Sequence, residues 1–334
     1  MLVSIIVPIY NVEEYIEDCL RSIVEQDCQE EIECVLVNDS TLDKSWILVQ
    51  EFIANYFGRV KFVLECHATN LGLSAARNTG LMKANGEYVL FLDSDDKLAP
   101  NAVKNLVAPL TFMNYDVVVG AYSMIPSSTN VLFINEGEIS TERIKQSYVF
   151  GEWYPMAWNK LCNRKFLHEQ RLFFLDGLIH EDELWSFQLA DKAKSMYIAN
   201  AITYEYRVRE NSIMSSLSAN LDEKLSRKII LYNKLIMYIC NKECNDVYDY
   251  LFLDQKLVYL LNDLYYLRTK LPSRKFYADI HQLFLPSFKK ECICLSLKHF
   301  IRNFHLALPV SLGYLYWKIY RRFHRIFLHS HEID

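Results

Sequence analysis

The sequence Asp93-Ser94-Asp95-Asp96 brings three carboxylates within four positions, directly after the apolar run at residues 87–92. Mg²⁺ and Mn²⁺ prefer carboxylate oxygen, and the phosphates of a substrate usually complete their coordination shell. Two carboxylates at a strand end can therefore hold a metal-bound phosphate. A solvated turn that caps the next helix explains the triplet equally well by itself. Its position at the end of an apolar run favours the metal site.

Polar side chains also follow the first two apolar runs of the chain. Asp39 and Asp43 come after the second run, where a carboxylate can accept the imide hydrogen of a uracil. Pro8 and Tyr10 end the first run, and the flat face of Tyr10 suits a stacked base. An Asx-type turn at Asp39 and a purely structural tyrosine are the alternative interpretations.

Two groups of cations can serve a phosphate. Arg77 stands alone among small residues in the segment 70–80, where it can reach a phosphate or orient an aspartate by paired hydrogen bonds. Arg207, Arg209 and Ser212 form a short patch that can hold a diphosphate leaving group. The alternatives are a surface arginine on an alanine-rich helix for the first and a solvated loop for the second.

An acidic cluster, His180-Glu181-Asp182-Glu183, precedes the apolar residues of an expected helix. Carboxylates in a first helical turn interact favourably with the helix dipole, which explains them without catalysis. The functional alternative is that one of them takes a proton from an attacking hydroxyl group.

The elements that must position these groups alternate between strand and helix. Short β-branched runs predict strands at residues 2–8, 33–38, 60–64 and 87–92. Helical spacing predicts helices at residues 12–25, 45–56 and 74–84, the last ended by a cap at Asn85-Gly86. This order predicts an α/β fold with a mostly parallel sheet covered by helices. Ligands bind such sheets at the carboxyl ends of the strands, where the polar clusters converge.

The remainder of the chain changes character. Residues 116–121 and 131–134 are expected strands, possibly antiparallel. Beyond Ser216, Leu- and Tyr-rich patterns predict helices at residues 222–240, 247–268 and about 276–285. We therefore expect a catalytic domain at residues 1–215 and a helical C-terminal region at residues 216–334.

Taken together, these segments resemble glycosyltransferase family 2, whose members are inverting enzymes with the GT-A fold, here of the bacterial surface-polysaccharide type. The resemblance covers roughly the first 215 residues, and its strength lies in the order and spacing of the set. The matching segments are residues 3–11, 37–39, 70–80, 91–96, 158–161, 180–183 and 206–207.

For the donor, the resemblance implies a nucleoside site and a diphosphate site. The residues it assigns to the nucleoside are Pro8, Tyr10, Asp39 and Asp43. It places Asp93 at the ribose and the diphosphate, and it assigns Asp95 to the metal ion, Mn²⁺ or Mg²⁺. The residues it expects to close over the diphosphate are Arg207, Arg209 and Ser212. Ser40 departs from the family, which commonly has glycine after the aspartate, and this puts the loop geometry in doubt.

For the reaction, the resemblance implies that Asp182 is the general base and that Glu181 helps to shape the acceptor site. Trp158 and Lys160 are implied near the donor sugar or the acceptor. The expected function is transfer of one sugar, from UDP by preference, to a hydroxyl on a lipid-linked or surface glycan. A processive synthase is disfavoured because the Gln-x-x-Arg-Trp motif and transmembrane helices are absent from the sequence.

Two other functions fit parts of the pattern. A sugar nucleotidyltransferase shares a parallel sheet and a metal aspartate, but usually has a glycine-rich loop where this chain has Tyr10-Asn11-Val12-Glu13. A non-catalytic glycan-binding relative is the second alternative, and the retained acidic residues argue against it.

Charge is distributed unevenly along the chain. The formal net charge is −5, so no nucleic-acid partner is expected, yet residues 296–334 carry +4 and leave −9 for the rest. Residues 314–328 predict a basic amphipathic helix that lies on an anionic membrane, the alternative being a helix packed on the catalytic domain. Because the sequence shows neither a signal peptide nor a run of about 18 apolar residues, we expect a cytoplasmic protein, with a peripheral position on the inner face of the plasma membrane as the alternative.

Overall fold

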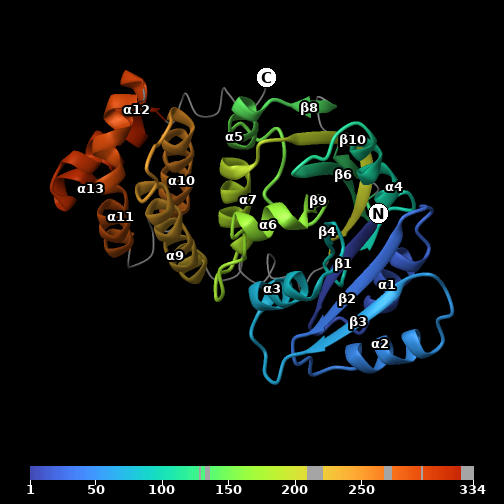
Figure 1. Ribbon diagram of the computed structural model, residues 1–334. Coiled ribbons are helices and arrows are strands. Elements are labelled where there is room, and N and C mark those ends of the chain that lie inside the picture. Colours follow the sequence, from blue (N-terminus) through green and yellow to red (C-terminus); the bar gives the residue numbers. More distant parts are fainter. Residues whose placement is uncertain (128, 132–135, 209–220, 267–272, 295, 325–334) are drawn as a thin grey trace. The chain divides into compact units, whose positions relative to one another are not determined.

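The computed structural model describes residues 1–127, 129–131, 136–208, 221–266, 273–294 and 296–324 (Figure 1). It divides into two units, Met1–Glu210 and Asn211–Asp334, each of which is described by itself. The predicted boundary between residues 215 and 216 falls outside the described residues and stays a prediction.

The first unit begins with the predicted alternation of strands and helices. Its strands are β1 (Leu2–Ile9), β2 (Glu31–Asn38), β3 (Lys61–Cys66), β4 (Tyr88–Phe91), β5 (Lys97–Leu98), β6 (Val117–Ile125), β7 (Thr129–Val131), β8 (Gly137–Ile139), β9 (Lys160–Asn163) and β10 (Met196–Arg207). Its helices are α1 (Ile16–Val24), α2 (Ser45–Ala54), α3 (Leu73–Lys83), α4 (Ala102–Val107), α5 (Thr141–Val149), α6 (Arg164–Glu169) and α7 (Glu181–Lys192), with a 3-10 turn η1 (Ala108–Thr111). The seven elements predicted before residue 92 are all present, although α1 starts four residues later than expected.

All these strands join one sheet in the order β3-β2-β1-β4-β9-β6-β10-β5, with β7 beside β6 and β8 beside β10. The first four strands are parallel, as predicted. β9 then runs antiparallel to both of its neighbours, while β6 and β10 are parallel to each other. The α/β prediction is confirmed, and the sheet is more mixed than its first third indicates because β9 enters between the two parallel parts.

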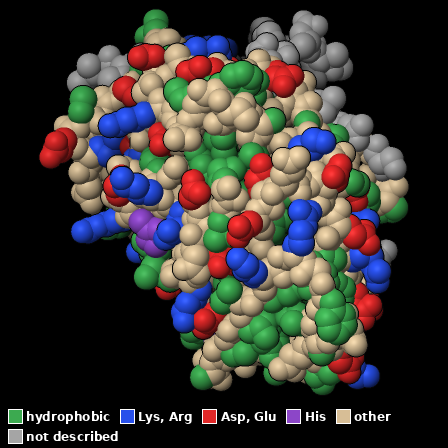
Figure 2. Space-filling view, turned by 45° about the vertical axis from the view of Figure 1, so that its right-hand side comes forward, with side chains coloured by type: hydrophobic (Ala, Val, Ile, Leu, Met, Phe, Trp, Pro, Cys, Tyr) green, Lys and Arg blue, Asp and Glu red, His purple; other side chains and the backbone are tan. Residues whose placement is uncertain are grey.

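Charged side chains of both signs share the face of the molecule drawn in Figure 2. Lys and Arg side chains lie among Asp and Glu side chains over most of that face. Opposite charges placed so close together screen one another, so the field over this face is mixed in sign.

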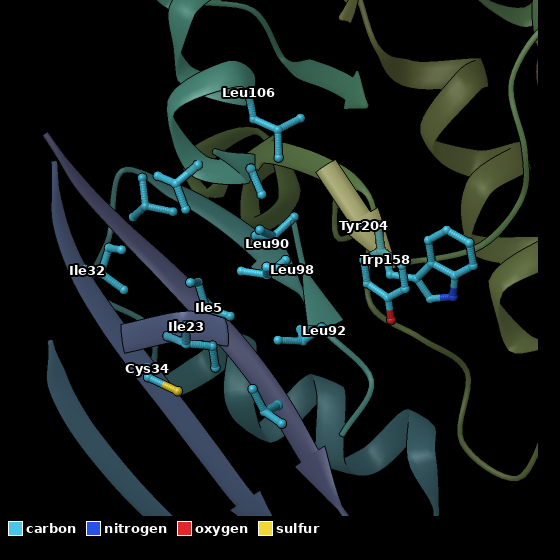
Figure 3. Packing of buried hydrophobic residues seen from close by; sticks show 14 of the residues in the cluster. Ile5, Ile23, Ile32, Cys34, Leu90, Leu92, Leu98, Leu106, Trp158 and Tyr204 are labelled. Atoms are coloured by element: carbon cyan, nitrogen blue, oxygen red, sulfur yellow. The ribbon is translucent and has the colours of Figure 1, made fainter. Parts of the chain in front are cut away.

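Alternate residues of β1 face opposite sides of the sheet, as the two-residue period of a strand requires. Ile5 lies in a buried cluster with Ile23 of α1 and Leu90 of β4 (Figure 3). Ile6 faces the other way, toward Gly80 of α3. Helices thus cover the sheet on both faces, and the carboxyl ends of β1, β2 and β4 are left to their loops.

The sequence predicts that Gly86 helps to cap helix α3, but its structural role is a different one. Helix α3 ends at Lys83 with Ala84 as its cap residue, and that residue has an extended backbone. A Cβ atom on Gly86 would lie 2.6 Å from the backbone nitrogen of Ser4. The backbone N–H of Gly86 donates to Ser4 Oγ at 2.8 Å. Glycine is therefore needed here for the close approach to β1, not for a left-handed turn.

The second unit is helical, as predicted. It contains α9 (Leu221–Cys240), α10 (Val247–Tyr266), α11 (Ser273–Cys294), α12 (Leu297–Asn303), a 3-10 turn η2 (Phe304–Ala307) and α13 (Val310–His324). Helix α11 extends well beyond the predicted residues 276–285 and contains Pro286. The predicted helix at residues 314–328 lies within α13 up to His324, and its last four residues are outside the described part. Among the described helices, none has the length and apolar character needed to cross a bilayer.

We predict that Gly80→Ala destabilises the first unit, because a Cβ atom there would lie 2.2 Å from a methyl carbon of Ile6. Overpacking of this kind costs about 1–3 kcal/mol. Met82→Ala, at an exposed position of the same helix, is the control and should change the free energy of unfolding by less than about 0.5 kcal/mol. Urea unfolding measures both values, and equal effects of the two substitutions would contradict the packing of α3 on β1.

Candidate active site

Arg77 joins two carboxylates that are far apart in the sequence. Its Nη2 atom lies 2.6 Å from Asp93 Oδ1, and its Nη1 atom lies 2.5 Å from Glu181 Oε1. The arginine side chain is only 3% exposed. Burial disfavours its charge, but the two carboxylates raise the pKa of Arg77, so the guanidinium stays charged. The turn after β4 and the start of α7 are therefore held together by one cation.

Neighbouring contacts fix the helix that carries Arg77. Asn78 Nδ2 donates to the carbonyl oxygen of Phe174 at 2.7 Å, and the Phe174 N–H donates back to Asn78 Oδ1 at 2.8 Å. The Phe174 ring stacks on Trp185 of α7 with centroids 4.8 Å apart. The same ring lies 5.2 Å from the guanidinium carbon of Arg77. Helices α3 and α7 thus meet through a shared aromatic residue, which sets the position of Glu181.

Asp182 follows directly after the bridged Glu181 in the first turn of α7. Burial and the adjacent Glu181 carboxylate raise the pKa of Asp182 to about 7, against the opposing charge of Arg77. A carboxylate with this pKa can accept a proton near neutral pH and is still partly ionised there. This environment suits a general base better than an ordinary surface aspartate does.

Lys160 and Trp158, predicted near the donor sugar or the acceptor, are both buried. Lys160 on β9 is fully enclosed, and its ammonium donates to the carbonyl oxygen of Met156. Burial lowers the pKa of Lys160 to about 7, against the nearby charge of Asp182. Trp158 stacks on Tyr204 at 4.2 Å between centroids (Figure 3). Both side chains are thus enclosed by protein atoms, and their expected place near the donor sugar or the acceptor stays a prediction.

The acidic turn after β4 is tied to the end of β10. Asp96 is buried, and it accepts hydrogen bonds from the Tyr204 hydroxyl at 2.6 Å and from the Arg207 backbone N–H at 2.7 Å. Arg207 Nε donates to the carbonyl oxygen of Asp95 at 3.1 Å. Asp93 and Asp95 are partly exposed beside the buried Asp96. The turn therefore presents two carboxylates outward on a fixed backbone.

Arg207 is held at this turn by two further residues. Its Nη2 atom lies 3.0 Å from Asp18 Oδ2, and its guanidinium carbon lies 5.1 Å from the centre of the Tyr15 ring. Both partners come from the segment after β1. The structure thus places Arg207 at the carboxylate turn, its expected contact with a diphosphate stays a prediction, and Arg209 and Ser212 lie outside the described residues.

Asp39 ends β2 as a buried carboxylate with three partners. Its oxygens accept from the backbone N–H groups of Leu71 and Gly72, each at 2.8 Å. His67 Nδ1 lies 2.7 Å from Asp39 Oδ1, and His67 Nε2 lies 2.9 Å from the Thr79 hydroxyl. A carboxylate has about four acceptor positions, so Asp39 keeps capacity for one further donor.

Asp43 organises the loop between β2 and α2. It accepts hydrogen bonds from the hydroxyls of Thr41 and Ser45 and from the backbone N–H groups of Glu13 and Ser45, at 2.6–3.0 Å. Burial opposes its charge, but these bonds lower the pKa of Asp43. Asp43 therefore holds this loop in place. Its expected contact with a nucleoside stays a prediction.

The two residues predicted at the end of β1 differ in exposure. Pro8 is buried, whereas Tyr10 is 40% exposed beside the loop that Asp43 holds.

Ser40, which stands where the family has glycine, has φ of 57°. That left-handed backbone is the one glycine favours, so the loop keeps the geometry of a glycine loop with a serine in it.

His67 and Asp18 belong to the site, although the sequence analysis did not select them. His67 directly follows β3, so its place at the carboxyl end of a strand was the available signal. Asp18 is one of two adjacent acidic residues in α1, and nothing local distinguishes it from Glu17. Within the described residues there is no group of three or more His, Cys, Asp or Glu side chains arranged to hold a metal ion.

Comparison with known proteins adds a family to this geometry. Residues 4–171 match the model of the family described as glycosyl transferase family 2. The chain is 31% identical over 223 residues to the glycosyltransferase GlyA of Streptococcus pneumoniae. That alignment covers 63% of this chain but only 31% of GlyA, so the chain spans about a third of that relative.

Solved structures share the fold. Residues 1–349 of TarS from S. aureus, in a crystal structure with UDP-GlcNAc, superpose with a TM-score of 0.74 at 20% identity. The superposition covers 96% of this chain and 92% of that one. The mannosyltransferase PcManGT from Pyrobaculum calidifontis, in complex with GDP-Man and Mn²⁺, gives a TM-score of 0.55 at 18% identity, covering 89% and 76%. At these identities the likeness confirms the predicted GT-A fold.

We predict that Arg77→Met lowers the free energy of unfolding by about 3–5 kcal/mol at pH 8, because Glu181 is left buried without its partner. Arg143→Met is the matched control. It breaks the solvent-exposed pair with Glu152 and should cost less than about 1 kcal/mol. Urea unfolding of both variants gives the comparison, and a cost for Arg77→Met as small as the control's would show that the bridge does not hold the site.

Proposed function

Since the chain belongs to glycosyl transferase family 2, we propose that it moves one sugar from a UDP-sugar to an acceptor hydroxyl with inversion of configuration. The acceptor is a lipid-linked or surface glycan. The observation that carries the proposal is the Arg77 bridge, which ties a carboxylate of the acidic turn to the residue before Asp182. One side chain thereby sets the distance between a diphosphate site and a base.

Asp182 takes the proton in the proposed reaction. It accepts the hydrogen of the acceptor hydroxyl while the acceptor oxygen attacks the anomeric carbon from the face opposite the diphosphate. The bond between the anomeric carbon and the diphosphate oxygen breaks, and the electron pair leaves with the nucleoside diphosphate. The raised pKa of Asp182, about 7, supports this role because proton transfer is most efficient near the operating pH.

The donor nucleotide is proposed to lie over the carboxyl ends of β1 and β2. The half-exposed Tyr10 ring offers a surface for the base, with Pro8 beneath the same loop. Asp39 keeps one acceptor position for an imide N–H, and its other bonds hold it in place. The UDP-GlcNAc in the related TarS structure supports a UDP-sugar as the donor.

Asp95 and Asp93 are proposed to hold Mn²⁺ or Mg²⁺ together with the donor diphosphate. They fit such an ion because they present carboxylate oxygens outward on a turn whose backbone is fixed by Arg207. These cations commonly bind one or two carboxylates, and the substrate phosphates complete the shell. When bound, the metal neutralises charge that develops on the leaving diphosphate. The Mn²⁺ in the PcManGT complex supports this assignment.

Arg207 is proposed to contact the diphosphate from the opposite side of the acidic turn. Its pairing with Asp18 is partly exposed, with exposed fractions of 23% and 55%, so a doubly charged ligand can compete for the guanidinium. Arg209 and Ser212 follow it in the sequence and are proposed to close over the same group. This arrangement places positive charge where the leaving group gains negative charge.

We predict that Asp182→Asn lowers kcat by at least about 1000-fold while the Kd for the UDP-sugar changes less than about threefold. The variant should also melt at a higher temperature, because the raised pKa of Asp182 means that its charge destabilises the folded state above pH 7. Glu183→Gln removes another acid from the same helical turn and serves as the control. An equal loss in Glu183→Gln would indicate that the acids serve only the helix dipole.

We predict that Asp95→Asn raises the Mn²⁺ concentration needed for half-maximal transfer by about tenfold or more, because a neutral amide replaces a carboxylate ligand. Asp27→Asn, at an exposed position of the same unit, is the control and should leave that concentration unchanged. Transfer assays over a Mn²⁺ titration after chelation measure both. Full activity of wild type in excess EDTA would refute the metal role.

A further inference from the structure

The last three elements of the second unit bury two polar side chains and leave several large apolar ones exposed. Asn303 and His305 are buried, with exposed fractions of 1% and 0%. Large apolar side chains of α12 and α13 are exposed instead, with exposed fractions of 36–71%. They are Leu297, Phe300, Ile301, Leu312, Leu315 and Ile319, and they define what we call the outer face. Large exposed apolar patches, especially those rimmed by polar residues, mark contacts with an apolar partner.

Buried polar contacts hold this arrangement in place. Asn303 Nδ2 donates to Asp254 Oδ1 of α10 at 2.7 Å, and Arg302 pairs with the same carboxylate. His305 Nδ1 lies 2.9 Å from the Tyr277 hydroxyl of α11. Burial, with the charges of His281 and Arg302, lowers the pKa of His305 to about 3 and keeps it neutral. These contacts fix the end of α12 and the turn η2, so α12 cannot simply rotate its apolar side inward.

The exposed residues of α12 and α13 belong to one surface. The Tyr316 hydroxyl of α13 donates to the carbonyl oxygen of Ile301 in α12 at 2.7 Å. The ring of Phe304 lies 5.7 Å from that of Phe300 and 5.8 Å from that of Tyr316. Tyr316 in turn stacks on Tyr320. This row of aromatic rings connects the two helices, and such rings favour the boundary between water and lipid.

Every charged side chain in residues 296–324 is basic. Lys298, Lys318 and Arg322 are exposed on α12 and α13. This single sign contrasts with the mixed charges on the face drawn in Figure 2. Two copies of the outer face would oppose cation to cation across a two-fold axis, which disfavours self-association. An apolar surface rimmed by cations suits an anionic lipid bilayer instead.

We propose that the outer face lies on the surface of an anionic bilayer, with its six apolar side chains in the boundary between headgroups and acyl chains and its cations at the phosphates. The binding is independent of the sugar-transfer reaction, so either can be tested without the other. It would place the enzyme at the same surface as a lipid-linked acceptor.

The test is flotation of the full-length protein with two kinds of vesicle, phosphatidylcholine alone and phosphatidylcholine with phosphatidylglycerol. We expect binding to the anionic vesicles that weakens as salt rises, and little binding to the neutral ones. Lys318→Gln with Arg322→Gln should weaken the anionic binding about 25-fold, since each cation contributes about fivefold. Equal partition into both kinds of vesicle would overturn the proposal.

The apolar contribution needs its own variant and control. Leu315→Ser with Ile319→Ser should reduce vesicle binding about tenfold or more, because both side chains leave the lipid boundary. Leu42→Ser with Phe57→Ser removes two equally large exposed side chains from the first unit and should leave binding unchanged. Circular dichroism and the melting temperature confirm that both variants fold. Equal losses in the two pairs, or a dimer of wild type that only the first pair dissociates, would overturn the proposal.

Discussion

The buried guanidinium of Arg77 is the constraint on which the rest of the active site depends. A cation enclosed to this degree needs two well-placed anions, and it finds them in Asp93 and Glu181, which lie 88 positions apart in the chain. Because the pair geometry is fixed, the turn after β4 and the first turn of α7 cannot move independently. The aromatic contact of Phe174 with both Arg77 and Trp185 reinforces the same connection.

The residues around Arg77 have different structural roles. Asp96 and Tyr204 hold the backbone of the acidic turn, on which Asp93 and Asp95 are partly exposed. Asp39 accepts hydrogen bonds from the segment after β3, and Asp43 holds the loop after β2, so together they fix the edge where the nucleoside is proposed to lie. Burial and the Glu181 charge raise the pKa of Asp182, and the enclosed Lys160 makes a smaller opposing contribution.

The sequence predicted the parallel part of the fold well because that part follows local rules. Apolar runs of β-branched residues gave β1 to β4 within two residues, and the polar residues after them marked the carboxyl edge. The partner of Arg77 on α7 could not be predicted, since it depends on how α3 and α7 pack against each other. The burial of Lys160 was missed for the same reason, because a strand that enters between two parallel parts becomes fully enclosed. The family resemblance supplied Asp182, which no local pattern distinguishes from its acidic neighbours.

The measurement that tests the central claim most directly is the pH dependence of kcat/KM in wild type and in Glu181→Gln. The account predicts that wild-type kcat/KM rises with pH through a single ionisation at about 7, the pKa of Asp182. In Glu181→Gln burial still raises this pKa, but the negative charge of Glu181 that raises it further is gone, so the midpoint should move to lower pH. A wild-type midpoint near 4, or one that stays in place when Glu181 is neutralised, would contradict the claim that the bridged acidic cluster supplies the base.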